Sequence, residues 1–387
     1  MTGETAPNAT APRAEMPPDA PKVADFDFPD FYRAMVERER MQVARDEMTW
    51  TEEGGRADRP DRPVEVLLNF GCAVRQTPHL QRDAVAVLDV LGVDFAAVAG
   101  QKFCCGKPYS GNGLPDAARQ VVRGSVKRMA GYRPSRAIQW CSACEMQFRD
   151  IVAPEIGIDF QSDGLAAFLV ERLDALGDAV PWRRETTIKA LVHGHLGEHP
   201  VRDAHPPIAM RLLERIPGVE LVGYAETPSL DLCDNHGLKM AAIGTGEYRA
   251  ARARLESDLA DAGADTLVTL YHGCTRELGK FASERLAVRH YVSIVAAALG
   301  VDHPDRFSRY WRLADPEKIK EAARPNWESW GFTEEEALRM AHRYFVPSYA
   351  VSAPECPCAG ECTRTGAAFL APRRIAAEPR RAPGDAG

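Results

Sequence analysis

Five cysteines within 73 residues constrain this chain more than any other feature of its sequence. They form the frame C-x31-CC-x35-CxxC, in which Gly106 directly follows the paired cysteines, and its members are Cys72, Cys104, Cys105, Cys141 and Cys144. A disulfide between Cys104 and Cys105 would be strained, because consecutive α-carbons lie about 3.8 Å apart, below the usual range for a bridged pair. Metal binding has no such difficulty, since neighbouring thiolates can bind different irons of one cluster and a CxxC turn can direct two sulfurs to one centre.

The frame therefore favours an iron–sulfur site. A tetrahedral zinc site would use four ligands and leave the fifth cysteine without a role, so zinc is the second interpretation. A third interpretation is that all five are inert buried thiols, because a free cysteine often packs as a small hydrophobic side chain. Their recurrence in loops that follow predicted strands argues against inert thiols.

Composition excludes several classes of protein. A chain of 387 residues can hold two or three domains, and its net charge of -7 provides no basic surface for nucleic acid. We find neither a run of about 18 apolar residues that could cross a membrane nor the charged start and apolar run of a secretory signal. The sequence predicts a cytoplasmic protein, in which clustered cysteines indicate metal or redox chemistry rather than disulfides.

Strands and helices alternate around the cysteine frame. Apolar runs at 64–70, 93–98 and 137–140 predict buried strands, and helical spacing of apolar residues predicts helices over 80–91 and 114–130. Each cysteine of the frame follows one of these strands. In an open α/β sheet, ligands bind beyond the carboxyl ends of the strands, so the cysteines are expected to meet at that edge.

The same pattern returns from residue 188 onward and closes with a helix predicted around residues 283–299. His193-Gly194-His195 corresponds to Phe70-Gly71-Cys72, Leu232-Cys233-Asp234-Asn235 to Phe103-Cys104-Cys105-Gly106, and Tyr271-His272-Gly273-Cys274 to Cys141-Ser142-Ala143-Cys144. Asp234 and Tyr271 are separated by 36 residues, against 35 in the first copy. The near-equal spacing predicts an internal duplication, and therefore an α/β fold with two similar Rossmann-like halves.

The second copy predicts a different metal site. Its candidate ligands stand in equivalent loops and are His193, His195, Cys233, Asp234, His272 and Cys274. Thiolate, imidazole and carboxylate suit zinc or a single iron better than a cluster. The alternative is a degenerate cluster site whose polar side chains only bond one another.

Extensions flank the two halves. We expect a disordered start, a helical extension and a linker over 1–62, the first half over 63–185, the second over 186–300, and a C-terminal strap with a cysteine-containing tail over 301–387. In the N-terminal extension, Asp30 is the expected cap of a helix that runs to about Met48. Thr333 and Glu336 offer a capping box for a helix within the strap.

The tail holds Cys356, Cys358 and Cys362. These cysteines could add metal ligands, cover the first cluster, or form a thiol–disulfide pair for exchange with substrate. The alternative is that they are incidental cysteines in a structureless tail.

The frame resembles the cysteine-rich CCG domain, best known from the B-type subunit of heterodisulfide reductase. The resemblance spans about residues 64–300, and the first copy matches in full. It implies two α/β halves and a noncubane [4Fe-4S] cluster that is held by the five cysteines and attacks disulfides directly. The second copy departs from the family, because His195, Asp234 and Tyr271 stand where cysteines would be. Cleavage of a disulfide held between two such clusters is therefore not implied here.

Two functions follow as hypotheses. The first is a disulfide-reductase-like iron–sulfur oxidoreductase subunit that reduces or forms a disulfide or thiol substrate. The second is an electron-transfer subunit between a flavoprotein and an acceptor; a scaffold or sensor with zinc in both halves is a third. The complete five-cysteine set favours the first, because cubane carriers need only four ligands. The chain has no ferredoxin-type C-x2-C-x2-C-x3-C run, so ferredoxin-like iron–sulfur and flavoprotein subunits are the expected partners.

Overall fold

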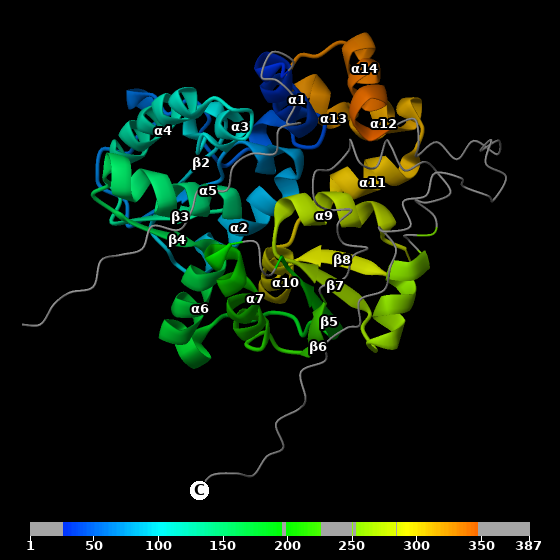
Figure 1. Cartoon of the computed structure of the whole chain (residues 1–387). Helices are drawn as coiled ribbons and strands as arrows, with labels where there is room; N and C mark the ends of the chain where they lie inside the picture. The colour runs from blue at the N-terminus through cyan, green and yellow to red at the C-terminus, as the bar shows by residue number, and fades with distance from the viewer. Residues whose placement is uncertain (1–25, 196–198, 226–249, 251–252, 284, 347–387) are drawn as a thin grey trace, which may run out of the picture.

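The computed structural model describes residues 26–195, 199–225, 250, 253–283 and 285–346 (Figure 1). Five cysteine and aspartate positions singled out in the sequence lie outside the described residues, namely Cys233, Asp234, Cys356, Cys358 and Cys362. Within the described part of the chain, no helix is both long enough and apolar enough to span a bilayer.

The first half is built on a four-stranded parallel sheet. Its strand order is β2-β1-β3-β4, and β1 contributes Val66, Leu67 and Leu68 to the interior, each with no exposed surface. Such a run, buried on both faces, is typical of a parallel strand covered by helices. The strands are β1 (Val66–Asn69), β2 (Phe95–Val98), β3 (Arg136–Gln139) and β4 (Gln161–Gly164), and the main helices are α2 (Pro78–Val90), α4 (Pro115–Ala130), α5 (Ser142–Gln147) and α6 (Leu165–Leu176).

The second half repeats this architecture. Its parallel sheet has the order β6-β5-β7-β8, which is the same sequence of second, first, third and fourth strand. The prediction of two similar α/β halves is therefore confirmed. The strands are β5 (Ile188–His193), β6 (Val219–Ala225), β7 (Thr266–Thr269) and β8 (Ala287–His290), and the helices are α7 (Pro200–Leu213), a helix over 253–261, α9 (His272–Leu278) and α10 (Tyr291–Leu299).

One apolar core joins the halves. Leu88 of α2 and Ile294 of α10 are both fully buried in it, and α6 packs on α7 at the same junction. Ala190 and Val192 of β5 belong to the same core. The two sheets thus share one continuous hydrophobic core, which fixes the position of their carboxyl edges relative to each other.

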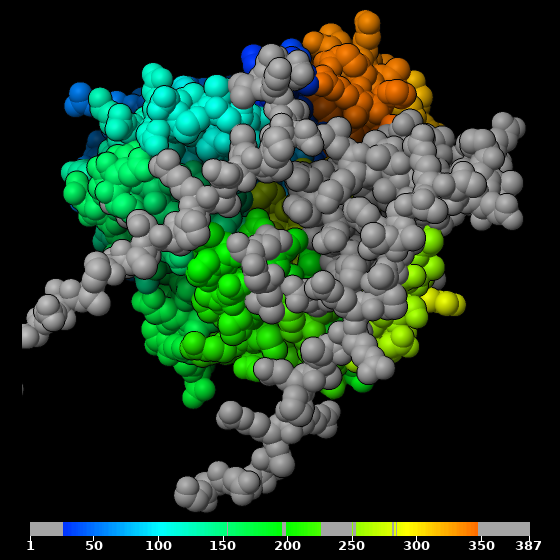
Figure 2. Space-filling model, in the orientation of Figure 1, coloured from blue at the N-terminus to red at the C-terminus, as the bar shows by residue number. Residues whose placement is uncertain are grey.

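The N- and C-terminal extensions pack on each other as one helical cap (Figures 1 and 2). Asn326 Nδ2 donates to the Met41 carbonyl at 3.0 Å, and Trp330 Nε1 donates to the Val43 carbonyl at 2.9 Å. The predicted capping box of Thr333 and Glu336 is confirmed. The cap comprises α1 (Phe28–Arg40), α11 (Arg306–Leu313), α12 (Pro316–Ala322), α13 (Arg324–Ser329) and α14 (Glu334–Phe345).

The start of α1 differs from the sequence prediction. Asp27, not Asp30, is the N-cap residue, and its carboxylate accepts from the Asp30 amide at 2.9 Å. Pro29 explains the shift, since a proline in the first turn of a helix has no amide hydrogen that would need a partner. The helix also ends at Arg40, earlier than the apolar spacing up to Met48 suggested.

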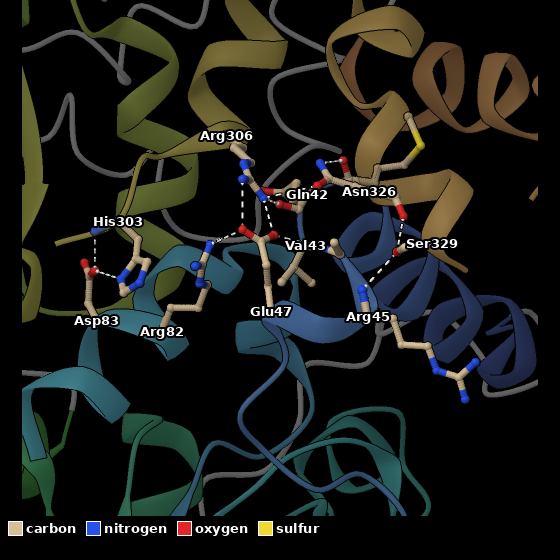
Figure 3. A network of polar contacts seen from close by, with 12 residues as sticks. Gln42, Val43, Arg45, Glu47, Arg82, Asp83, His303, Arg306, Asn326 and Ser329 are labelled. Carbon is tan, nitrogen blue, oxygen red and sulfur yellow. Dashed lines mark hydrogen bonds and ion pairs between the residues drawn. The ribbon is translucent and has the colours of Figure 1, made fainter. Parts of the chain in front are cut away.

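A carboxylate at the centre of a polar network ties the cap to the first half (Figure 3). Glu47 accepts from Arg306 Nη1 at 2.7 Å, from Arg82 Nη1 at 2.8 Å and from the Ala44 amide at 2.9 Å. Burial alone would raise the pKa of Glu47, but the two guanidinium groups and the amide outweigh it and lower that pKa to about 2 from the usual 4.5.

Substituting Glu47→Gln should therefore destabilise the protein in a pH-dependent way. Because the folded-state pKa is depressed, the stabilising contribution is present above about pH 4.5 and is lost as the pH falls toward 2. We expect a loss of about 2 kcal/mol at pH 7, after discounting for partial exposure of the carboxylate, and convergence with the wild type only near pH 2. Urea unfolding at both pH values measures the difference in the free energy of unfolding between variant and wild type. Glu335→Gln, on the exposed face of α14, is the control. A loss that is equal at both pH values would contradict the electrostatic origin.

Candidate metal centres

All five cysteines of the frame lie at the carboxyl edge of the first sheet. Cys72 follows β1 in the loop before the short 3-10 helix η4 (Ala73–Gln76), and Cys104 and Cys105 follow β2. Cys141 and Cys144 lie at the start of α5, directly after β3. Because β1 is hydrogen-bonded to both β2 and β3, the three loops converge at one place.

The structure brings the five thiols into one connected group. Cys72 Sγ and Cys104 Sγ lie 3.9 Å apart. Further thiol–thiol hydrogen bonds link Cys104 to Cys105, Cys105 to Cys144, and Cys144 to Cys141. Four of these side chains are buried, with at most 7% exposed, while Cys141 is half-buried.

Two glycines allow the loops to approach the sulfurs. Gly71 has φ +66°, and a Cβ there would lie 3.0 Å from Cys144 Sγ. Gly106, the glycine of the CCG motif, has φ +82°, and a Cβ there would meet the Ala118 carbonyl at 2.9 Å. Its amide donates to Cys104 Sγ at 3.4 Å. A side chain at either position would force the loop away from the cysteines, which explains the residue type.

The thiols do not share one protonation state. Hydrogen bonds from Cys105 and then Cys72 lower the pKa of Cys104 well below its ordinary 9.0. The same bonds raise the pKa of Cys72 and of Cys105, whose thiols act as donors. A hydrogen bond from Cys144 lowers the pKa of Cys141 to about 7. The site therefore favours thiolate at Cys104 and Cys141, and thiolate is the form that binds metal.

The distances between the five sulfurs indicate whether they suit a single metal ion or a larger cluster. Among the residues that the structure describes, only His193, His195 and Cys274 form a trio of His, Cys, Asp or Glu side chains whose ligand atoms all lie within 4.8 Å of one another. No three of the frame's sulfurs, all of them described, are that close. Cysteine ligands of one zinc lie about 3.8 Å from each other, given a Zn–S distance of about 2.3 Å. The five thiols thus fit a larger, multi-iron group better than a single ion.

Tyr32 is a site residue that the sequence did not reveal. It lies on α1 in the N-terminal extension, and its hydroxyl donates to Cys104 Sγ at 3.4 Å. Arg75, three residues after Cys72, is 5% exposed and donates from Nε to Glu39 at 2.8 Å, so it is buried and paired rather than solvated. The only sequence signal for Tyr32 was the density of aromatic residues around residue 30.

The second half gathers a smaller group at the equivalent edge. His193 ends β5, His195 follows two residues later, and Cys274 lies in the first turn of α9 after β7. His195 Nε2 and Cys274 Sγ are 3.2 Å apart. Three of the six predicted ligands are therefore together. His272 is also buried but lies outside this trio. It is near His290, whose pKa is lowered to about 3, mainly by burial and then by the neighbouring His272.

A hydrogen-bonded bridge runs between the two groups. Glu145 Oε2 lies 2.9 Å from His205 Nε2, and His205 Nδ1 lies 3.1 Å from the Tyr271 hydroxyl. A carboxylate can only accept, so His205 donates from Nε2 and accepts from Tyr271 at Nδ1. Glu145 is adjacent to Cys144, and the Tyr271 ring lies 5.6 Å from that of His195. His205 was not singled out from the sequence, since it stands in helix α7 away from any motif.

Comparison with known proteins addresses the family of the cysteine frame. Residues 66–149 match the family model described as a cysteine-rich domain, CCG. The chain contains a CCG domain. The resemblance inferred from the cysteine spacing is thereby confirmed for the family, whereas the specific likeness to the B-type subunit of heterodisulfide reductase stays a prediction.

Two of the relatives that this chain resembles are subunits of different oxidoreductases. The chain is 26% identical over 246 residues to the C-type subunit of the anaerobic glycerol-3-phosphate dehydrogenase of Escherichia coli (strain K12), covering 61% of this chain and 59% of the relative. It is 25% identical over 233 residues to the D-type subunit of the dihydromethanophenazine:CoB–CoM heterodisulfide reductase of Methanosarcina barkeri, covering 56% and 54%. The chain thus spans less than two thirds of either relative. A solved structure of an aspartate racemase homologue from Pyrococcus horikoshii OT3 aligns with a TM-score of 0.33 and 10% identity, over 61% of this chain and 96% of its own.

Proposed function

We propose that this chain is an iron–sulfur subunit of an oxidoreductase, and that it reduces or forms a disulfide. Cys72, Cys104, Cys105, Cys141 and Cys144 would hold a [4Fe-4S] cluster of the noncubane type. When bound, the cluster would supply single electrons to a sulfur of the substrate. The observation that carries the proposal is the convergence of five thiols, four of them buried, at one sheet edge.

The residues of the chain would hold and shield this group. Gly71 and Gly106 let the backbone approach the sulfurs, and the Gly106 amide directs a hydrogen bond at Cys104. Reduction of one disulfide to two thiols consumes two electrons and two protons. The electrons would come from a ferredoxin-like iron–sulfur or flavoprotein partner subunit, and the protons from solvent.

The second group would bind zinc. His193, His195 and Cys274 offer two imidazoles and a thiolate, and three such protein ligands with one further position are typical of zinc sites. Cys233 and Asp234, which lie outside the described residues, remain predicted further ligands, as Cys356, Cys358 and Cys362 remain predicted accessory ones. The zinc would hold the loops at the edge of the second sheet in place.

A second candidate function is electron transfer without substrate chemistry. The relative from the anaerobic glycerol-3-phosphate dehydrogenase favours it, because the activity in that enzyme's name involves no disulfide. Burial of four of the five thiols is also compatible with a carrier. In that case the chain would pass electrons between a flavoprotein and an acceptor.

Anaerobic purification followed by iron and acid-labile sulfide analysis tests the proposal. We expect about four irons and about four sulfides per chain, and a change in the electron paramagnetic resonance spectrum when a thiol is added to the oxidised protein. Turnover of a small disulfide with a low-potential dye as electron donor separates the two candidates. Iron and dye oxidation without disulfide reduction would favour the carrier, and protein without iron would refute both.

A further inference from the structure

An aromatic layer from the N-terminal extension covers one side of the cysteine group. Tyr32, Cys72 and Cys104 form a buried cluster of their own, against which Phe28, Phe31 and Tyr109 pack. The Phe28 ring stacks on that of Tyr109, with centroids 4.4 Å apart and planes 6° from parallel. Tyr109 belongs to α3 (Lys107–Ser110), which begins directly after the CCG loop. Helix α1 therefore lies on the loop that carries two of the cysteines.

Within this layer, the Tyr32 hydroxyl forms a hydrogen bond with the Cys104 sulfur. The side chain is only 7% exposed, and its hydroxyl donates to Cys104 Sγ at 3.4 Å. The neighbouring Phe31 ring contacts it edge-on, with centroids 5.1 Å apart. A buried hydroxyl needs a partner, and here the partner is the Cys104 sulfur.

Anchors on both sides fix α1 in this position. Toward the first half, Glu39 is buried and accepts from Arg75 Nε at 2.8 Å, and Arg38 bonds the side chain of Gln76. Toward α14, Glu37 accepts from Arg339 at 3.3 Å and from the Tyr344 hydroxyl. Helix α1, which carries Tyr32, thus lies between the cysteine loops and α14 (Figure 1).

We propose that α1 is part of the cysteine centre, with Tyr32 as a positioning residue that donates a hydrogen bond to the Cys104 sulfur and with its aromatic neighbours excluding water from the Cys72–Cys104 side. The hydrogen bond would stabilise negative charge on that sulfur, and reduction adds negative charge to the centre, so the bond should raise the reduction potential. The inference about potential rests on the proposed cluster. It goes beyond the CCG domain, because Tyr32 lies outside the matched residues 66–149.

The test compares two conservative variants in the same cap. Tyr32→Phe removes the hydroxyl that bonds sulfur, and Tyr310→Phe removes one that donates to the Ala322 carbonyl within the C-terminal helices. In redox titrations of the loaded protein monitored by electron paramagnetic resonance, we expect a shift to lower midpoint potential in Tyr32→Phe and the wild-type potential in Tyr310→Phe, at unchanged iron content. An unshifted potential in Tyr32→Phe, or an equal shift in both variants, would overturn the role of the hydroxyl.

A second measurement does not depend on the cluster. The reduced, metal-free chain is treated with iodoacetamide, and the rate of alkylation at each cysteine is followed by peptide mass spectrometry. We expect several-fold faster labelling of Cys72 and Cys104 in Tyr32→Ala than in the wild type or in Tyr310→Ala. If the wild type contains no iron but labelling is accelerated in Tyr32→Ala, the covering role of α1 is supported and the proposed function is refuted. If iron is present but neither the labelling rate nor the midpoint potential changes in the Tyr32 variants, the role proposed for α1 and Tyr32 is refuted and the proposed function is not.

Discussion

Cys105→Ala is expected to lose its iron and all disulfide reduction. Cys105 is 3% exposed and lies in the middle of the sulfur group, where its thiol is linked by hydrogen bonds to both Cys104 and Cys144. Alanine removes the ligand while leaving the positive-φ loop at Gly106 intact, so the chain should still fold. Iron and sulfide content, the visible absorption spectrum and turnover of a small disulfide measure the effect. All three should fall to background.

Cys274→Ala provides the matched control. It removes one buried cysteine, also 3% exposed, from the equivalent edge of the second sheet. Because Cys274 contacts His195 and none of the five frame cysteines in the described contacts, iron in the first centre should be retained. If Cys105→Ala kept both iron and turnover, the frame would not be the cluster site. If both variants lost iron alike, the loss would reflect general destabilisation.

The duplicated fold and the meeting of the five cysteines were predictable because both depend on periodic local signals. Strand runs such as Val66–Asn69 end just before Cys72, and parallel strands deliver their following loops to one edge. Strands β4 and β8 were not predicted, because their sequences carry no clear strand signal. Strand β4 reads Gln-Ser-Asp-Gly and has no buried residue, so only its backbone bonds to β3 define it. Strand β8 directly precedes the apolar helix α10, and its residues merged into the predicted helix.

The contributions of Tyr32 and His205 could not be predicted because they are non-local. Tyr32 reaches Cys104 from a helix outside the repeat, and its place depends on how α1 is clamped between Arg75 and α14. His205 lies in α7 of the second half, yet it bonds Glu145 of the first. No spacing in the sequence encodes either pairing. The contacts of His205 with Glu145 and with Tyr271 form a polar link between the two halves of the fold.

His195→Ala is expected to release zinc from the second centre. The His195 ring stands 3.2 Å from Cys274 Sγ and completes the trio with His193. Without it, two described ligands remain, fewer than the three or four protein ligands that zinc sites use. Zinc measured by elemental mass spectrometry should fall from about one ion per chain to background. The melting temperature should fall as well, because a metal that binds only the folded chain stabilises it.

Two comparisons make this zinc prediction decisive. His342→Ala, on an exposed position of α14, removes an imidazole elsewhere and should keep the zinc. Cys105→Ala should keep it too, while His195→Ala keeps the iron, so that each centre is lost independently. Wild-type protein without zinc, or zinc that persists in His195→Ala, would show that the trio is a hydrogen-bonded remnant of a cluster site. Simultaneous loss of iron in His195→Ala would indicate general destabilisation, as it would in Cys274→Ala, and would remove the support for a separate zinc centre.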